Sequence, residues 1–146
     1  MKISQKGIEH IKQVEGLKLT KYVCSAGKNT IGIGHVIQPN ENYTTITVEK
    51  AEELFKHDIE NVENWLNKNA SWCSQHEFDA LCSFLFQYGT TLLARGFINT
   101  HNAIVQGNKA EVLRFLENDF NHAVAKNKDG LLKSRRQKEI RLFKGE

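Results

Sequence analysis

The apolar residues of this 146-residue chain follow two different periods. Over about residues 15–46, apolar and polar side chains tend to alternate, which is typical of β-strands. In the first fifteen residues and after residue 47, apolar side chains recur at intervals of three and four, which is typical of amphipathic helices. The sequence therefore predicts an α+β fold with a small N-terminal β lobe over about 15–46. The first helix and residues 47–146 would form a larger helical lobe, and a cleft between the two lobes is the natural place for a site.

Polar capping residues set the predicted helix boundaries. Helices are expected to begin at or just after Ser4, Thr47, Ser74, Asn99, Asn108 and Ser134. In three of these cases Glu or Gln follows three positions after the cap, as in a capping box: Ser74 with Glu77, Asn108 with Glu111, and Ser134 with Gln137. Glycines are expected to end helices at Gly16, Gly89 and Gly107, and the last helix should run to about Phe143.

Within the β lobe, turn residues separate three predicted strands. The expected order is a strand from Leu17, a turn over 25–29, a strand over 30–37 that contains two glycines, a loop over 38–42, and a short strand over 43–46.

Composition narrows the class of protein only slightly. Hydrophobic residues make up 40% and charged residues 25%, an ordinary globular balance, and the net charge of +3 is too small to identify a partner. The three cysteines are an odd number, so at least one thiol should be free. No secretory leader or membrane-spanning run is visible, so we expect accumulation in the cytoplasm. The histidines and cysteines do not follow zinc-site spacing, so no metal is expected.

Three functional side chains occur at a regular spacing around the start of the β lobe. Eight residues separate Glu15 from Cys24, and five separate Cys24 from Thr30. Thr30 opens the segment Thr-Ile-Gly-Ile-Gly-His, whose alternate glycines leave one strand face bare for the close approach of a ligand or another backbone. By residue type alone, Glu15 would be a solvated carboxylate at a helix end, and Thr30 an ordinary strand residue.

These residues resemble the phage-type lysozymes, the muramidase endolysins of tailed bacteriophages. That family has a catalytic Glu, then Asp or less often Cys after eight residues, then Thr after five more, as in this chain. Two later segments resemble the family as well: residues 80–89, which end in Phe-Gln-Tyr-Gly, and residues 130–143, which contain Gly-Leu-Leu-Lys-Ser-Arg-Arg-Gln-Lys-Glu. The three segments occur in family order over nearly the whole chain, so the resemblance implies a single lysozyme-like catalytic domain over 1–146.

The resemblance also implies roles for individual residues. Glu15 would protonate the leaving oxygen, Cys24 would act opposite it in place of the commoner Asp, and Thr30 would hold a water molecule or the Cys24 side chain. The substrate-binding candidates are His35, Phe86, Gln87 and Arg135. For Phe86 the alternative is core packing, and for His35 it is a structural pairing with a carboxylate.

Two questions about these roles stay open in the sequence. An arginine of the last helix is expected to contact Glu15, and Arg135 fits that position better than Arg136. Cys24 could attack the sugar as a thiolate, which would retain configuration at the anomeric carbon, whereas a residue that only positions water would invert it. A thiol with an ordinary pKa is only slightly ionised at neutral pH, so Cys24 would be a weak general base.

The implied function is hydrolysis of the β-1,4 bond between N-acetylmuramic acid and N-acetylglucosamine in peptidoglycan, without a cofactor, for lysis of the host cell. The protein would be a monomer that depends on a membrane-permeabilising holin to reach the cell wall or periplasm. Alternatives are a catalytically altered glycan-binding protein of the same fold and a lytic transglycosylase. A basic helical module for nucleic acid, built on Lys and Arg of 126–138, lacks interleaved aromatic residues, so we expect no nucleic-acid partner.

Overall fold

The computed structural model describes residues 1–24, 27–94, 96–126 and 131–146, with the side chains of 120–126 and 131–132 outside the description. The described elements are α1 (Gln5–Glu15), β1 (Lys18–Val23), β2 (Asn29–Gly32), β3 (His35–Val36), α2 (Val48–Asn69), α3 (Gln75–Tyr88), α4 (Ile98–Gln106), α5 (Lys109–Lys126) and α6 (Leu131–Phe143). The predicted turn over 25–29 and the Gly130 of the C-terminal motif lie partly or wholly outside the described residues.

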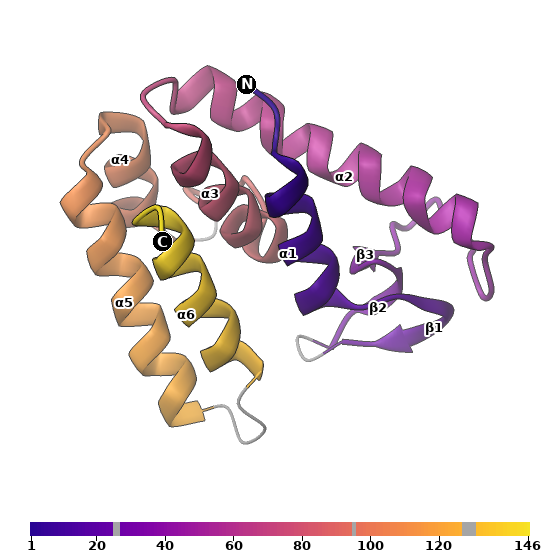
Figure 1. Ribbon diagram of the computed structural model, residues 1–146. Helices are drawn as coiled ribbons and strands as arrows, with labels where there is room; N and C mark the ends of the chain where they lie inside the picture. Colours follow the sequence, from indigo (N-terminus) through magenta and orange to yellow (C-terminus); the bar gives the residue numbers. More distant parts are fainter. Residues whose placement is uncertain (25–26, 95, 127–130) are drawn as a thin grey trace.

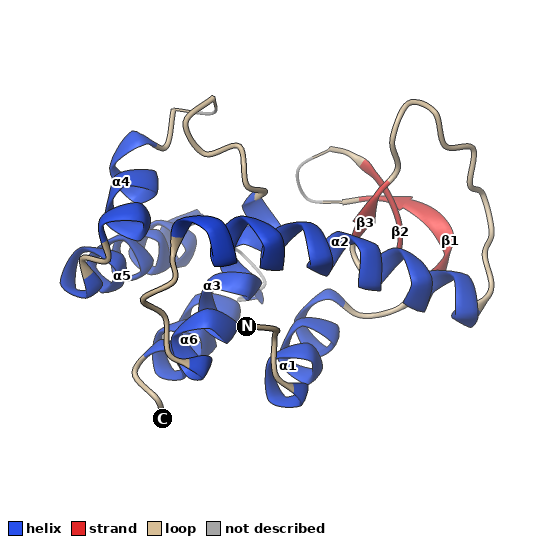
Figure 2. Cartoon of the chain, turned by 90° about the horizontal axis from the view of Figure 1, so that it is seen from above, coloured by secondary structure: helices blue, strands red, loops and turns tan. Residues whose placement is uncertain are grey.

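The three strands gather at one end of the molecule and most helices at the other (Figure 1). The long helix α2 runs along the molecule from the sheet to the helical end, as both ribbon views show (Figures 1 and 2). It packs against β2 and β3 and also against α3. The predicted α+β arrangement with a small N-terminal β lobe is therefore confirmed.

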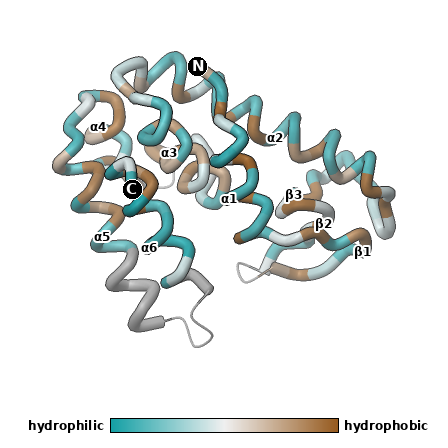
Figure 3. The backbone as a smooth tube through the Cα atoms, in the orientation of Figure 1, coloured by the Kyte–Doolittle hydropathy of each residue, from teal (hydrophilic) through white to brown (hydrophobic). Residues whose placement is uncertain are grey.

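Helix α2 links the two lobes because it contributes to two separate hydrophobic cores. Near its start, Ala51 and Leu54 pack with Ile31 and Ile46 in the core of the β lobe. Further along, side chains from Phe55 to Leu66 join the main core, which α1 and α3–α6 complete. Figure 3 shows the hydrophobic and hydrophilic segments that alternate along this helix. Burial of both sets of side chains fixes the position of the β lobe relative to the helices.

The β lobe is a three-stranded antiparallel sheet in the order β1-β2-β3. The prediction of one strand over 30–37 is wrong, because Gly32 and Gly34 adopt positive φ values of 68° and 66° and turn the chain into a tight hairpin. The predicted strand over 43–46 is reduced to an isolated bridge between Thr45 and Thr20.

The predicted helix starts hold at most positions. Ser4 and Thr47 accept hydrogen bonds from the backbone N–H groups three residues later, and Ser74 with Glu77 forms the capping box. The predicted start at Ser134 is wrong, because α6 already begins at Leu131 and Ser134 lies inside it. The Ser134 and Gln137 pair resembles a capping box only in spacing.

Candidate active site

Glu15 is the last residue of α1, at the point where the chain leaves the helix for the β lobe. Gly16 follows with φ 73°, and its N–H still donates to the carbonyl of Lys12, so the helix ends here by a glycine cap. The Glu15 side chain is 17% exposed, and its carboxylate accepts a hydrogen bond from Nη1 of Arg135. Arg135 is thus the arginine of the last helix that contacts Glu15.

Arg135 is held on all sides of its guanidinium group. Besides the contact with Glu15, Nη2 donates to the backbone carbonyl of Ser83 at 2.7 Å, and Nε donates to Glu139 at 3.3 Å. The side chain is only 7% exposed. A fork of donors with three fixed acceptors keeps the guanidinium in one orientation, which in turn fixes the carboxylate of Glu15.

Gly34 brings the β lobe into direct contact with Glu15. A Cβ atom on Gly34 would lie 2.8 Å from Cδ of Glu15, and the φ of 66° at this position is one that side chains rarely adopt. The absence of a side chain therefore lets the backbone of the β2–β3 hairpin pass beside the carboxylate. This close approach explains the second glycine of the Thr-Ile-Gly-Ile-Gly-His segment.

Cys24 directly follows β1, and Thr30 lies on β2 of the same hairpin. The N–H of Cys24 donates to the carbonyl of Lys28 at 2.9 Å and closes the hairpin loop. Tyr22 pairs directly with Thr30 across the strands, so their side chains share a face, and Cys24 follows Tyr22 by two positions on that same face. The hairpin therefore groups a phenol, a thiol and a hydroxyl on one face.

The electrostatics of Tyr22 connect this face to Glu15. Burial raises the pKa of Tyr22 above its ordinary value, and the charges of Glu15 and then Cys24 raise it further. Both groups must lie close to the phenol to act on it in this way. Glu15, Cys24 and Thr30, the three predicted catalytic residues, are therefore brought to one region of the molecule around Tyr22.

The hydroxyl of Thr30 already uses its hydrogen. The side chain is buried, and Oγ1 donates to the carbonyl of Lys28 at 3.0 Å. The oxygen lone pairs remain as acceptors. Thr30 can therefore accept a hydrogen bond from a water molecule or from the thiol of Cys24, and it does not need to move to do so.

A cleft of about 250 Å³ lies between the β lobe and the helical lobe. Its walls come from the β3 hairpin, from α2, and from the end of α3 with the residues that follow, including Gly34, His35, Asp58, Phe86 and Gly89. Phe86 is half-buried and also packs on Phe55, with ring centroids 5.6 Å apart, so it serves both the core and the cleft. Through Gly34 the cleft adjoins the carboxylate of Glu15.

His35 lines this cleft, but its ring is occupied within the protein. Nδ1 lies 2.7 Å from Asp58 of α2, and Nε2 lies 2.8 Å from Glu41 of the following loop. The hydrogen bond to Asp58 raises the pKa of His35 above its ordinary value against the effect of burial, and the bond to Glu41 adds to it. This geometry supports the alternative that His35 has a structural role, in which its ring connects the β lobe to α2 by hydrogen bonds.

Gln87 does not line the described cleft. It stands next to Phe86 near the end of α3, and its side-chain oxygen accepts a hydrogen bond from Nη2 of Arg136. Arg136 is 1% exposed and also lies over the rings of Phe84 and Tyr88. The two adjacent arginines of α6 thus serve different partners, Arg135 for Glu15 and Arg136 for Gln87.

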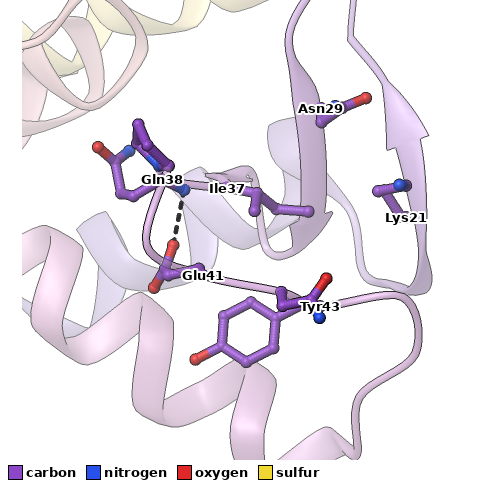
Figure 4. Close-up of a pocket in the computed structure, with 8 residues that line it drawn as sticks. Lys21, Asn29, Ile37, Gln38, Glu41 and Tyr43 are labelled. Atoms are coloured by element: carbon purple, nitrogen blue, oxygen red, sulfur yellow. Dashed lines mark hydrogen bonds between the residues drawn. The ribbon is translucent and has the colours of Figure 1, made fainter.

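A second hollow of about 290 Å³ opens on the β lobe (Figure 4), and Glu15, Cys24 and Thr30 are not among its lining residues. Glu41 lies in it and accepts a hydrogen bond from the N–H of Gln38 at 2.8 Å. Gln38 lines both this hollow and the cleft, so the two adjoin.

Among the described residues, no group of three or more His, Cys, Asp or Glu side chains is arranged to hold a metal ion. Within the same part of the chain, no helix has the length and apolar character needed to cross a membrane.

Comparison with known protein families gives a match over most of the chain. The model of the phage lysozyme family matches residues 12–139, which include the end of α1, the β lobe and most of α6. The chain belongs to the phage lysozyme family. Residues 12–139 of the match contain all seven predicted site residues.

Individual relatives of the phage lysozyme family give the same result. An endolysin of Acyrthosiphon pisum secondary endosymbiont phage 1 is 41% identical over 92 residues, which are 62% of this chain and 62% of that protein. An endolysin of Salmonella phage P22 is 38% identical over 99 residues, which are 64% of this chain and 68% of that protein. The first match thus spans less than two thirds of the relative's length.

A solved structure extends the comparison over the whole fold. The endolysin from Escherichia coli O157:H7 phage FAHEc1 is 32% identical, with a TM-score of 0.70 over 98% of this chain and 93% of that one. The lysozyme-like α+β fold expected from the sequence is therefore confirmed.

Several residues around the phage lysozyme site were not identified from the sequence. Tyr22 could have been found, because it precedes Cys24 by two positions on a predicted strand. Ser83 carried no such signal, since a Ser on a helix is usually exposed. Glu139 belongs to the C-terminal segment that resembles the family, but no individual role was predicted for it from the sequence. Their burial beside Arg135 becomes visible only when α3 and α6 are brought together.

Proposed function

We propose that this protein is an endolysin that hydrolyses the β-1,4 bond between N-acetylmuramic acid and N-acetylglucosamine in peptidoglycan. The observation that carries the proposal is the placement of Glu15. Its carboxyl group is mostly buried at the junction of the two lobes, fixed by Arg135 and adjoined by the backbone of Gly34. A carboxyl group in such a position at the edge of a cleft suits general-acid catalysis on a bound glycan.

In the proposed reaction Glu15 donates its proton to the leaving glycosidic oxygen as the bond to the anomeric carbon breaks. The Arg135 guanidinium holds this carboxyl group in place by a hydrogen bond. After the leaving group departs, the regenerated carboxylate is again stabilised by Arg135. The arginine would therefore serve mainly the later half of the reaction.

Cys24 and Thr30 would act on the opposite side of the sugar ring. Two routes are consistent with their chemistry. In one, the Cys24 thiolate bonds to the anomeric carbon as the glycosidic bond breaks, and a water molecule that gives its proton to the Glu15 carboxylate later displaces the thiolate with net retention. In the other, a water molecule held by Thr30 attacks the anomeric carbon directly with inversion and gives its proton to the Cys24 thiolate. The acceptor lone pairs of Thr30 suit the second route, because they can hold the water by one of its hydrogens.

Clearing of permeabilised Gram-negative cells, followed as a fall in turbidity, tests the hydrolase. We expect clearing by the wild-type protein and its loss in Glu15→Gln. Glu9→Gln is the matched control, because Glu9 is an exposed glutamate on the same helix and should keep full activity. Sedimentation with purified wall without clearing would instead show a glycan-binding protein of the same fold.

The variant Cys24→Asp separates the two routes. If Cys24 is the nucleophile, the wild-type protein retains configuration. If wild type and Cys24→Asp both invert, Cys24 is not the nucleophile. Anomeric resolution of the released fragments by NMR, directly after cleavage, measures this outcome.

In the cell, the proposed activity would serve lysis of the host. We propose that the protein accumulates in the host cytoplasm, acts as a monomer, and reaches the cell wall after a holin permeabilises the membrane. It would need no cofactor and no nucleic-acid partner. Expression in a Gram-negative host with and without a co-expressed holin tests the dependence, because lysis should require both proteins.

A further inference from the structure

A buried carboxylate on α6 connects the two arginines that hold the site. Glu139 is fully buried, and its Oε1 accepts hydrogen bonds from Nε of Arg135 at 3.3 Å and from Nη2 of Arg136 at 3.1 Å. Its other oxygen, Oε2, lies 3.0 Å from Nε of Arg136. Arg135 extends from this carboxylate to Glu15, and Arg136 extends from it to Gln87.

We propose that Glu139 is a positioning residue shared by both halves of the site, which directs Arg135 toward Glu15 and Arg136 toward Gln87. It touches neither Glu15 nor Gln87 in any contact of the described residues, so it would act only through the arginines. The inference rests on the proposed hydrolase, since it concerns how that site is assembled.

Helices α3 and α1 hold the carboxylate of Glu139 from the other side. Ser83 of α3 is fully buried and donates its hydroxyl hydrogen to Oε1 of Glu139 at 2.5 Å. His10 of α1 lies 2.9 Å from the same hydroxyl through Nε2. Because the hydroxyl hydrogen is used on Glu139, His10 must donate from Nε2. Burial, followed by the charges of Arg135, Lys138 and Arg136, lowers the pKa of His10 to about 4, which keeps its ring neutral.

The network therefore forms a closed path that begins and ends on α1. It runs from His10 through Ser83, Glu139 and Arg135 back to Glu15, five positions after His10 on the same helix. After His10, every hydrogen bond of the path has a buried donor, which is Ser83 for the first bond to Glu139 and Arg135 for the other two. Such a path explains why Ser83, a polar residue, occupies a fully buried position within the apolar stretch 80–86 of α3.

Charge balance gives Glu139 a second effect on the site. The two guanidinium groups face three carboxylates, those of Glu15, Glu139 and Asp119, the last at 3.4 Å from Nε of Arg136. Burial raises the pKa of Glu139 above its ordinary value, and the charges of both arginines and the Ser83 hydroxyl act in the opposite direction. Loss of the Glu139 charge would make the surroundings of Glu15 more positive by one charge and favour its ionised form. Among the described residues, the other titratable groups that face this cluster are Asp119 and Tyr88 beside Arg136, Tyr22 and Cys24 beside Glu15, and Lys138 and His10, and the substitution leaves all of them in place.

The test is the pH profile of kcat/KM for cell clearing, measured on Glu139→Gln. The alkaline limb of the profile reports loss of the proton from the general acid. We expect this limb to move to lower pH by about 0.5–1 unit, the size expected for the loss of one buried charge at a neighbouring site. We also expect KM to rise about threefold or more, because Arg136 would no longer fix Gln87.

Three further variants make the result specific. Glu117→Gln removes an exposed glutamate of α5 and should leave both the limb and KM unchanged. Gln87→Ala should raise KM without moving the limb. Glu139→Asp keeps the charge on a shorter side chain, so it should lower kcat/KM at least threefold and leave the limb in place. If the alkaline limb of Glu139→Gln lies at the same pH as that of the wild type, the proposal is overturned. Partial unfolding of the variant would lower its activity but would not move this limb, so a shifted limb distinguishes the proposed role from a loss of stability.

If Glu139→Gln does not fold, as judged by circular dichroism, Glu139→Asp decides, and wild-type kinetics in that variant would overturn the proposal. The Nε–H signals of Arg135 and Arg136 in ¹⁵N NMR give a readout that does not need activity. We expect slow solvent exchange of both signals in the wild type and fast exchange in the Glu139 variants. Slow exchange in a wild-type protein that cannot clear cells would refute the proposed function but support this arrangement.

Discussion

Arg135 donates a hydrogen bond to the carboxylate of Glu15, although 120 positions separate them in the chain. The contact joins the last helix to the end of the first and places the candidate acid beside the β lobe. Both side chains are mostly buried, so neither can be replaced without loss of a charged partner.

Replacement of Glu15 by Gln should abolish most of the activity and leave the fold intact. Gln has the same shape and can still accept the hydrogen bond from Arg135, but it cannot donate a proton to a leaving oxygen. We expect the clearing rate to fall about 100-fold or more, as for the loss of a general acid. Circular dichroism spectra that match the wild type would show that the loss is chemical.

Gly34→Ala should impair activity more than its effect on stability explains. The substitution strains a backbone of φ 66° and drives Cβ against the Glu15 carboxylate. Gly96→Ala is the control, because its φ of 84° imposes similar strain while its Cβ would meet nothing within 4 Å. Each variant should lose about 1–2 kcal/mol of unfolding free energy. Only Gly34→Ala should lose tenfold or more in clearing rate, and equal losses in both variants would contradict the close approach to Glu15.

The hydrogen bonds of His35 to Asp58 and Glu41 should make the stability of the β lobe depend on pH. The pKa of His35 is raised in the folded protein, so its contribution is fully present below the unfolded value of about 6.5. The contribution is lost as the pH rises through the raised folded value. We therefore expect His35→Phe to cost about 2–4 kcal/mol at pH 5.5 and clearly less at pH 9.

Thermal unfolding of wild type and His35→Phe at the two pH values measures this difference. His10 also titrates, but it is present in both proteins and cancels in the comparison. An equal cost at both pH values would show that His35 stabilises the lobe only by packing.

The three thiols should differ in reactivity in the folded protein. Cys73 and Cys82 are buried, and desolvation raises the pKa of Cys73 to about 12 and that of Cys82 even further. Cys24 is partly exposed near Glu15 and Tyr22. A thiol reagent should therefore modify Cys24 first and stop cell clearing with one equivalent incorporated. Peptide mass spectrometry identifies the labelled residue, and early labelling of Cys82 would contradict the described burial.

Local patterns in the sequence were sufficient for most of the helices. The caps at Ser4, Thr47 and Ser74 lie where they were expected, because a cap depends on residues within one turn. The strand over 30–37 was predicted wrongly because an alternating apolar pattern does not reveal glycines with positive φ. Ser134 was misplaced because capping-box spacing also occurs by chance inside a helix.

The candidate site depends on contacts that no local pattern contains. The spacing of Glu15, Cys24 and Thr30 indicated the site only through the family resemblance. The contact of Glu15 with Arg135 joins distant segments, and the role of Glu139 requires the packing of α3 on α6. Gln87 was expected to face the substrate. In the structure its side chain accepts a hydrogen bond from Arg136, and its role in substrate binding stays a prediction.

The most direct test of the proposed function is the identity of the fragments released from purified peptidoglycan. Mass spectrometry of digests by wild type, Glu15→Gln and Glu9→Gln measures it. The proposal predicts fragments with N-acetylmuramic acid at the reducing end from wild type and Glu9→Gln, and none from Glu15→Gln. Anhydro-sugar ends, cleavage at another bond, or full digestion by Glu15→Gln would contradict it.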